Sequence, residues 1–168
     1  ITGGSTTGDI QIDIEDPSSI STALSKIGKL DAVVSAAGKT AFVPLSEITA
    51  NSISDSVYAL GIRNKLMGQV NLALASRRHL NDGGSITLTT GVLADQYIVA
   101  GTSASMVNGA IEAFVKSASI ELERGIRINA ISPNLLIESA EDYGPLFRGF
   151  EPIPADRAAI AYSRSVEG

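Results

Sequence analysis

Few side chains in this sequence could supply or hold a proton. Lys65 lies in a predicted helix, Thr89 and Thr90 end a predicted strand, and Ser103 opens another predicted helix. A hydroxyl can hold a substrate oxygen and a lysine ammonium can release a proton, which together suit general acid catalysis. Each of these residues also has an ordinary structural role, as a solvated lysine, a strand-end hydrogen bonder or a helix cap.

Two other residues are weaker candidates for chemistry. Tyr97 lies in a polar loop, where it would serve to anchor the chain. His79 is the only histidine and stands beside Arg77 and Arg78 near the end of a predicted helix. Histidine changes charge readily near neutral pH, but we do not expect this one to be catalytic.

The first eight residues, ITGGSTTG, contain glycines and hydroxyls like those of nucleotide-binding loops. A Walker A loop needs Lys and then Ser or Thr after its last glycine, whereas Asp9 follows Gly8. A dinucleotide-binding loop must open a helix, but residues Ile10–Ile14 alternate as a strand does. We therefore interpret this segment as a turn between strands.

The candidate residues lie around one predicted strand–helix–strand unit. Ser85–Thr89 and Ile126–Ile131 have strand character. Thr102–Glu123 has apolar residues at helical spacing, and Gly125 follows as a cap. Two buried strands joined by a helix of this length form a right-handed parallel crossover.

The remaining segments are also predicted to form helices and a strand of an α/β protein. Pro17–Ile27 is a predicted helix capped by Asp16, and Asp31–Ser35 is a predicted buried strand. The small residues Ala36, Ala37 and Gly38 end that strand, at the sheet edge where α/β proteins bind ligands. Further along, Glu47–Leu80 is predicted to be mostly helical, Asn134–Ile153 to be a loop or lid, and the segment from Pro154 to be a final short helix.

Composition narrows the class of protein. The 168 residues form one predicted domain, 44% of them apolar, with a net charge of −5 and no cysteine. An acidic chain lacks the basic surface that nucleic acid requires, and no apolar run is long enough to span a bilayer. We expect a cytoplasmic protein that binds neither nucleic acid nor membrane and uses no metal.

The order of these segments resembles the short-chain dehydrogenase/reductase family. The match covers nearly the whole chain, and the most specific part is Gly125–Pro133, GIRINAISP, which is close to a family strand motif. Ser35–Gly38 is similar to the family's Asn-Asn-Ala-Gly strand end, and Gly4–Asp9 resembles a turn of divergent bacterial members. The resemblance implies a doubly wound, Rossmann-like parallel sheet in an α/β/α sandwich.

In that alignment, the family's first strand, its Gly-rich loop and the following helix would precede residue 1. The family's last strand would follow Gly168. The first strand lies centrally in the family's sheet, and buried ladder groups without partners cost about 1–3 kcal/mol each. We therefore expect the intact protein to be longer than 168 residues, which mass spectrometry of the intact protein can check.

The catalytic residues are where the chain departs from the family. The family pairs a serine with a Tyr-x-x-x-Lys motif, in which the lysine lowers the pKa of the phenol. Here the tyrosine position falls on Ala104, the lysine position on Asn108 and the serine position on Gly91. Moving the register by two residues gives Thr102 and Met106, which is no better. The family's helical asparagine corresponds to Lys65.

Two functions remain open. The first is an NAD(P)-dependent oxidoreductase that transfers hydride between nicotinamide and a carbonyl or alcohol, with Lys65, Thr90 or Ser103 in place of the usual proton donor. The second is a dinucleotide-binding sensor or structural partner without turnover. NADP is favoured over NAD because no acidic residue ends the strand that would hold the ribose. The resemblance places the following residues at the cofactor: Ser5, Thr6, Asp13, Ile14, Ser35, Ala36, Ala37, Gly38, Pro133 and Leu136.

The remaining expectations concern partners. Thr102–Glu123 has apolar residues around most of its circumference, which favours packing against a second copy in a homodimer or homotetramer. Tyr143, Phe147 and Phe150 in the lid are typical of an apolar pocket for a small-molecule substrate.

Overall fold

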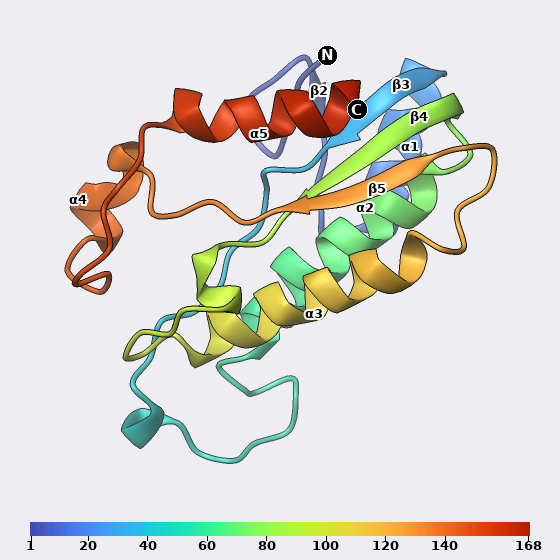
Figure 1. The fold of residues 1–168 in the computed structure, drawn as a ribbon. Coiled ribbons are helices and arrows are strands. Elements are labelled where there is room, and N and C mark those ends of the chain that lie inside the picture. The colour runs from blue at the N-terminus through green and yellow to red at the C-terminus, as the bar shows by residue number, and fades with distance from the viewer.

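A parallel sheet forms the centre of the computed structural model, which describes residues 1–168 (Figure 1). Its strands are β3 (Leu30–Val34), β4 (Leu80–Thr89) and β5 (Arg127–Ile131), in the order β3-β4-β5. The β4–β5 pairing runs in register from Ser85 opposite Arg127 to Thr89 opposite Ile131. The predicted parallel crossover is therefore confirmed.

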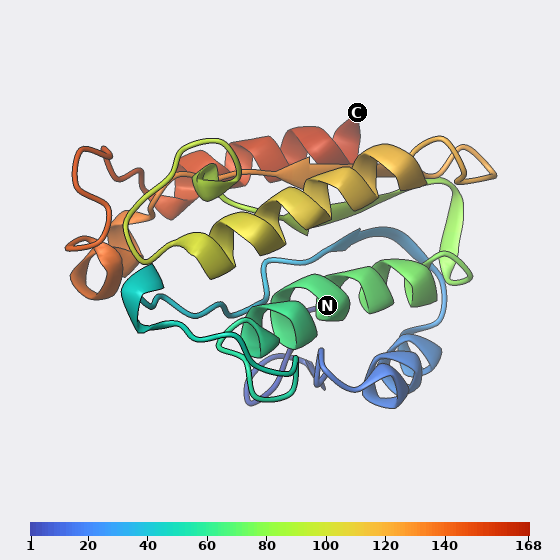
Figure 2. The same cartoon turned by 90° about the horizontal axis from the view of Figure 1, so that it is seen from below.

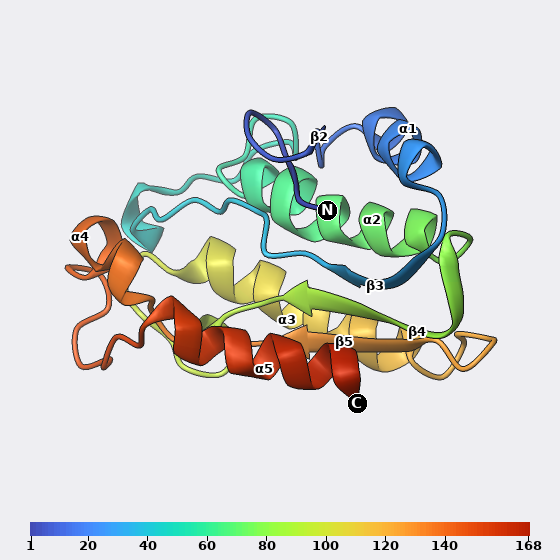
Figure 3. The same ribbon diagram turned by 90° about the horizontal axis from the view of Figure 1, so that it is seen from above.

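Helices cover both faces of this sheet. α2 (Gly68–Ser76) and α3 (Thr102–Ala118) lie on one face, and α5 (Ala155–Glu167) lies on the other (Figures 1 and 2). α1 (Pro17–Ile27) packs beside α2, as Figure 3 shows from above. The Asp16 carboxylate accepts the Ser18 backbone N–H, so the predicted cap of α1 is present. The α/β/α sandwich expected from the sequence is confirmed.

The core fills the space between the sheet and the α2–α3 layer. Ile86 and Leu88 of β4 and Val107 and Ile111 of α3 have no exposed surface. Alternate residues of a strand and every third or fourth residue of a helix share a face, so both apolar patterns meet in this layer. Burial of each such side chain contributes about 1.5–3 kcal/mol.

The amino-terminal segment forms a second, smaller sheet. β1 (Gly3–Gly4) and β2 (Ile10–Gln11) pair in parallel, with Gly3 opposite Ile10. This sheet is not hydrogen-bonded to β3. The strand predicted over Ile10–Ile14 is shorter than expected, because the backbone turns at residues 14 and 15 before α1.

Several predicted boundaries were wrong. The predicted Glu47–Leu80 helix consists of the 3₁₀ turn η1 (Leu45–Glu47), an irregular stretch, the π-helix η2 (Gly61–Met67) and α2, and Leu80 already belongs to β4. α3 ends at Ala118 rather than Glu123, because the Ile120 and Glu121 N–H groups donate three residues back, to Ser117 O and Ala118 O, in a turn. Further along, Arg124 and Gly125 adopt positive φ, 58° and 69°. Tertiary contacts hold this turn, since the Arg124 guanidinium donates to Leu80 O and Arg77 O.

The segment predicted as a loop between Asn134 and Ile153 is partly ordered into helix. It contains the 3₁₀ turn η4 (Ile137–Ser139) and α4 (Ala140–Tyr143), and its two ends meet in a bridge between Leu136 and Ile153. Its aromatic side chains pack on the segment after β3, with the Phe42 and Tyr143 ring centroids 5.6 Å apart. None of the helices combines the length and apolar character that crossing a membrane requires.

Candidate active site

A cavity of about 390 Å³ opens beyond the carboxyl ends of β4 and β5. The Val92 N–H donates to Pro133 O over 2.9 Å, which holds the segments after these two strands together. The cavity is walled by the segment after β3, by η2, by the start of α3 and by the segment before α5. Its lining residues are Gly38, Lys39, Thr40, Phe42, Leu60, Lys65, Thr90, Gly91, Val92, Leu93, Ala104, Asn108, Pro133, Asn134, Leu135, Leu136, Ser139, Tyr143 and Phe147.

Lys65 is held at the floor of this cavity. Its Nζ donates to Thr90 O over 2.8 Å and to Asn108 Oδ1 over 2.7 Å. An ammonium has three N–H donors, so one is left without a protein acceptor. Burial lowers the pKa of Lys65 to about 8, because desolvation disfavours the charged form. The amine can therefore gain or lose a proton close to neutral pH.

Asn108 fixes the position of this lysine from α3. Asn108 is buried, accepts from Lys65 and donates its amide Nδ2 to Gly91 O over 3.3 Å. The oxygen and the nitrogen of the Asn108 side-chain amide therefore both have a hydrogen-bond partner. Ala104 lies one helical turn earlier on the same face and contributes only a methyl group to the cavity wall.

Gly38 lets the chain after β3 pass closely over the lysine stem. Its φ is 134°, and a Cβ at this position would lie 2.6 Å from Lys65 Cγ and 2.9 Å from Lys65 Cα. A side chain here would displace the lysine. The next residue, Lys39, donates its backbone N–H to Asn64 Oδ1, and Asn64 donates to Glu15 Oε1, each over 2.7 Å. Asn64 therefore joins the segments that follow β2 and β3.

The end of β4 is locked by side chains from both faces. Gln69 of α2 accepts from Thr89 N and donates to Thr89 O, both over 2.8 Å. The Thr89 hydroxyl donates to Ser35 O over 2.6 Å, so the Tyr162 hydroxyl, 2.7 Å away, is the donor to Thr89. These bonds fix the strand end that carries Thr90 and its Lys65-binding carbonyl.

The structure brings together two of the three predicted catalytic residues. Lys65 and Thr90 both line the cavity, whereas Ser103 does not. Ser103 is 2% exposed, its hydroxyl has no hydrogen-bond partner, and it packs against Gly61 of η2. Tyr97 is 74% exposed in its loop. His79 bonds to Gly28 O at the opposite end of the sheet.

The predicted cofactor residues divide into three groups. Gly38, Pro133 and Leu136 line the cavity. Ser35 is buried behind it, and Ala36 and Ala37 are exposed in the chain between Ser35 and Gly38. The remaining four lie around the small sheet, with Ser5 and Thr6 exposed in the turn after β1 and Asp13 and Ile14 following β2.

Four residues of this region were missed as candidates from sequence. They are Asn108, Asn64, Gln69 and Phe42. A signal existed for Asn108, which the sequence resemblance places at the family's lysine position, and for Asn64, which adjoins Lys65. Gln69 and Phe42 carry no such signal, because only the packing of distant segments gives them a role.

A parallel sheet with helices on both faces, and a cavity beyond the carboxyl ends of its strands, defines an α/β protein of the dinucleotide-binding class. Comparison with known sequences agrees with this class. The profile of the family described as enoyl-(acyl carrier protein) reductase matches residues 2–160. The chain therefore belongs to the short-chain dehydrogenase/reductase family of oxidoreductases.

Individual relatives support the same assignment. The crystal structure of the protein lin1944 from Listeria innocua is 48% identical, with a TM-score of 0.93 over 100% of this chain and 82% of that one. A small-chain dehydrogenase crystallised with NADPH is 29% identical, with a TM-score of 0.69 over 91% of this chain and 64% of the other. Versicolorin reductase stcU of Emericella nidulans is 29% identical over 93% of this chain. The chain spans 39%, 47% and 61% of the lengths of three curated relatives, the last of them stcU.

Proposed function

We propose that this protein is an NADP-dependent oxidoreductase that interconverts a carbonyl and an alcohol, with Lys65 as the proton donor. The observation that carries this proposal is the Lys65 ammonium, bonded to Asn108 and Thr90 O and lining the cavity. Ala104 occupies the position of the family's tyrosine, so no phenol is available there. Lys65 lines the cavity, and burial lowers its pKa to about 8, close to neutral pH.

The chain's own residues fit the nicotinamide end of a dinucleotide. Gly38, Gly91 and Pro133 present backbone and small side chains to the cavity, which leaves room for a flat ring. Ser5 and Thr6 are exposed hydroxyls that can bond a 2′-phosphate, and no carboxylate follows β1 directly to oppose it. These features favour NADP, the cofactor that the 29% identical small-chain dehydrogenase holds in its reduced form. When bound, the dinucleotide supplies the hydride.

The residues of the chain then have separate tasks in carbonyl reduction. The free N–H of Lys65 binds the carbonyl oxygen and polarises it. As the carbon gains hydride, the oxygen takes the proton from Nζ, which leaves a neutral amine. Asn108 Oδ1 and Thr90 O hold Nζ in place throughout, so no reorganisation is needed as charge develops on oxygen. In alcohol oxidation, the neutral amine accepts the proton.

A second function, dinucleotide binding without turnover, is favoured by one observation. The phenol that would normally meet the substrate is replaced by the Ala104 methyl group, and Ser103, another candidate, lies outside the cavity. A sensor or structural partner needs only the binding surface. This alternative predicts the same affinity for NADPH but no consumption of it.

Two measurements distinguish the oxidoreductase from the protein without turnover. The first is a binding titration with NADPH, and the second follows the loss of NADPH absorbance in the presence of a panel of ketones and aldehydes. The oxidoreductase proposal expects turnover that Lys65→Gln reduces by about a hundredfold or more, within the range of general acid contributions, while NADPH affinity is retained. Lys116→Gln, the same substitution at an exposed lysine of α3 outside the cavity, is the control and should leave turnover unchanged. Tight NADPH binding without consumption by any carbonyl would support the silent alternative.

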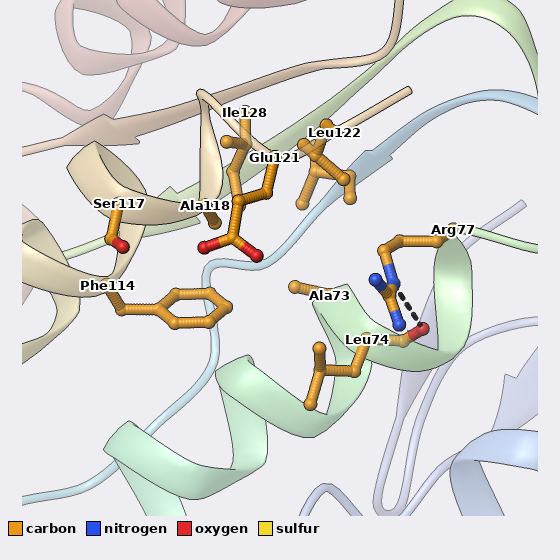
Figure 4. Close-up of a pocket in the computed structure, with 10 residues that line it drawn as sticks. Ala73, Leu74, Arg77, Phe114, Ser117, Ala118, Glu121, Leu122 and Ile128 are labelled. Atoms are coloured by element: carbon orange, nitrogen blue, oxygen red, sulfur yellow. Dashed lines mark hydrogen bonds between the residues drawn. The ribbon is translucent and has the colours of Figure 1, made fainter. Parts of the chain in front are cut away.

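We also propose that the protein assembles as a homodimer through the outer faces of α2 and α3. A groove of about 270 Å³ lies between these helices, lined mainly by apolar residues, with Arg77 and Glu121 at its rim (Figure 4). Leu74 on one side of the groove is 43% exposed, and Met106 on α3 is 45% exposed. In an isologous contact, Arg77 of one copy can face Glu121 of the other.

A further inference from the structure

The cavity carries a positive charge that the protein does not neutralise. Of its nineteen lining residues, the charged ones are Lys39 and Lys65, and no carboxylate is among them. The ion pair of the structure joins Arg124 and Asp82 at the other end of the sheet. Glu112, on α3, accepts from the Thr90 hydroxyl over 3.3 Å and makes no ion pair with Lys65.

The groups that do contact Lys65 are neutral. Thr90 O and Asn108 Oδ1 occupy two of its three donors, and they bring dipoles but no counter-charge. A partly buried cation without a counter-ion costs free energy, because its hydration is lost and no opposite charge replaces it. A ligand anion reaching the free N–H would recover that energy.

Part of the cavity lining is aromatic. Phe42, Tyr143 and Phe147 all line it, and the Phe42 centroid lies 5.6 Å from that of Tyr143 and 6.4 Å from that of Phe147. Ala104 leaves space where a larger side chain would stand. A cavity of about 390 Å³ is at the small end of the range for ligand sites, about 300–1,000 Å³. Because the nicotinamide end of the dinucleotide would occupy part of this space, a substrate with a single ring is of a suitable size.

From this arrangement we infer the substrate class, on the basis of the proposed oxidoreductase function: an aromatic or cyclic ketone that carries an anionic oxygen next to the carbonyl. The ring packs against Phe42, Tyr143 and Phe147. The carbonyl oxygen and the neighbouring anionic oxygen share the free N–H of Lys65, and Lys39 adds positive potential at the rim. The anionic oxygen belongs to a carboxylate, a phenolate or the enolate of a β-diketone. Each of these oxygens accepts the same charge-assisted hydrogen bond from the Lys65 ammonium.

The test compares ortho-acetylbenzoate with its methyl ester, which have the same ring and ketone and differ in charge. Dissociation constants are measured calorimetrically on the NADP⁺-loaded protein, which cannot reduce the ketone, and NADPH consumption is followed separately. A hydrogen bond to a charged group is worth about 1.5–3 kcal/mol, so we expect the acid to bind about tenfold to a hundredfold more tightly than the ester. A cyclic β-diketone against the matching monoketone repeats the comparison for an enolate.

Lys65→Gln should abolish the preference for the acid, because it removes the charge but keeps a polar side chain. Lys116→Gln, an exposed lysine of α3 outside the cavity, should leave the preference unchanged. Equal affinity for acid and ester, or a preference that survives in Lys65→Gln, would overturn the inferred substrate class. The proposed oxidoreductase function would stand in that case if NADPH is consumed. Preferential binding of the acid without NADPH consumption would instead show that the cavity binds this class of ligand and would contradict the proposed turnover.

Discussion

In the alignment that the sequence resemblance suggests, Lys65 and Asn108 occupy each other's places in the family. In the family the helix that here contains Asn108 provides the lysine, and the helix that contains Lys65 provides an asparagine. In this chain the two side chains still meet, with Nζ 2.7 Å from Oδ1. The pair is therefore retained with its members exchanged. The same alignment places Ala104, whose methyl group lines the cavity, at the family's tyrosine position.

The first prediction at this scale concerns pH. Burial lowers the pKa of Lys65 to about 8, and only the protonated amine can donate. For carbonyl reduction we expect kcat/KM to be constant below pH 8 and to fall about tenfold per pH unit above it. Alcohol oxidation needs the neutral amine and should show the opposite trend. Measured pH–rate profiles in both directions check this, and a reduction rate that rises through pH 9 would contradict it.

A second residue-scale prediction concerns Gly38. In Gly38→Ala the new Cβ would lie 2.6 Å from Lys65 Cγ, and the backbone φ of 134° is unfavourable for any side chain. We expect a loss of about 1–3 kcal/mol in the free energy of unfolding together with loss of activity.

Gly28→Ala is the matched control for that substitution. Gly28 also has a positive φ, of 86°, but no atom lies within 4 Å of an added Cβ. Urea unfolding and NADPH consumption measured on both variants separate backbone strain from displacement of the lysine. Gly38→Ala with normal activity would show that the Gly38–Lys65 contact does not position the amine.

Among the elements, η2 and α5 hold the site from opposite faces of the sheet. The wide turn of the π-helix η2 carries Asn64 and Lys65, and α2 continues from it with Gln69 bonded to the end of β4. π-Helical turns cost stability and are frequent at functional sites. On the other face, Tyr162 and Ser165 of α5 bond to Thr89 and Thr87. Polar side-chain contacts therefore fix the positions of α2 and α5 against β4, one on each face of the sheet.

The attachment of α5 gives a prediction at the element scale. Arg127 of β5 donates Nη1 to Ser165 O and Nη2 to Val166 O, each over 2.8 Å, and so caps the carboxyl end of α5. Arg127→Met should destabilise this attachment by about 1.5–3 kcal/mol. The backbone amides of α5 should then exchange hydrogen faster, while those of α3 are unchanged.

Arg164→Met provides the comparison, because Arg164 is exposed on α5 itself and its side chain makes no hydrogen bond. Hydrogen exchange followed by mass spectrometry resolves the two helices. If both variants accelerate exchange in α5 equally, charge on the helix rather than the Arg127 cap would hold it to the sheet.

At the scale of the whole molecule, the exposed apolar side chains on α2 and α3 are consistent with the proposed dimer. We expect light scattering to report a dimer at micromolar concentration, and Leu74→Asp to produce a folded monomer, because a carboxylate would be buried in the contact. Ile160→Asp is the control, since Ile160 is 64% exposed on α5, on the opposite face of the sheet. Dissociation by Ile160→Asp alone would place the interface on that opposite face.

The sequence was sufficient for the elements whose patterns are local. The predicted bounds of α1 agree with the structure, because Asp16, Pro17 and Gly28 mark both ends within the segment itself. The strand–helix–strand unit was predictable for the same reason, since apolar periodicity reports burial whatever the partner is. Lys65 and Thr90 were identified as candidates by residue type and position.

The tertiary structure decided what depends on distant segments. α3 ends before its apolar pattern does, and beyond its end Arg124 binds carbonyls of Arg77 and Leu80, far away in the sequence. Ser103 faces Gly61 rather than the cavity, and Asn108 meets Lys65 across forty-three residues. A contact of this kind depends on how two helices are turned against each other. Their relative rotation is set by the packing of the whole core, which no local pattern encodes.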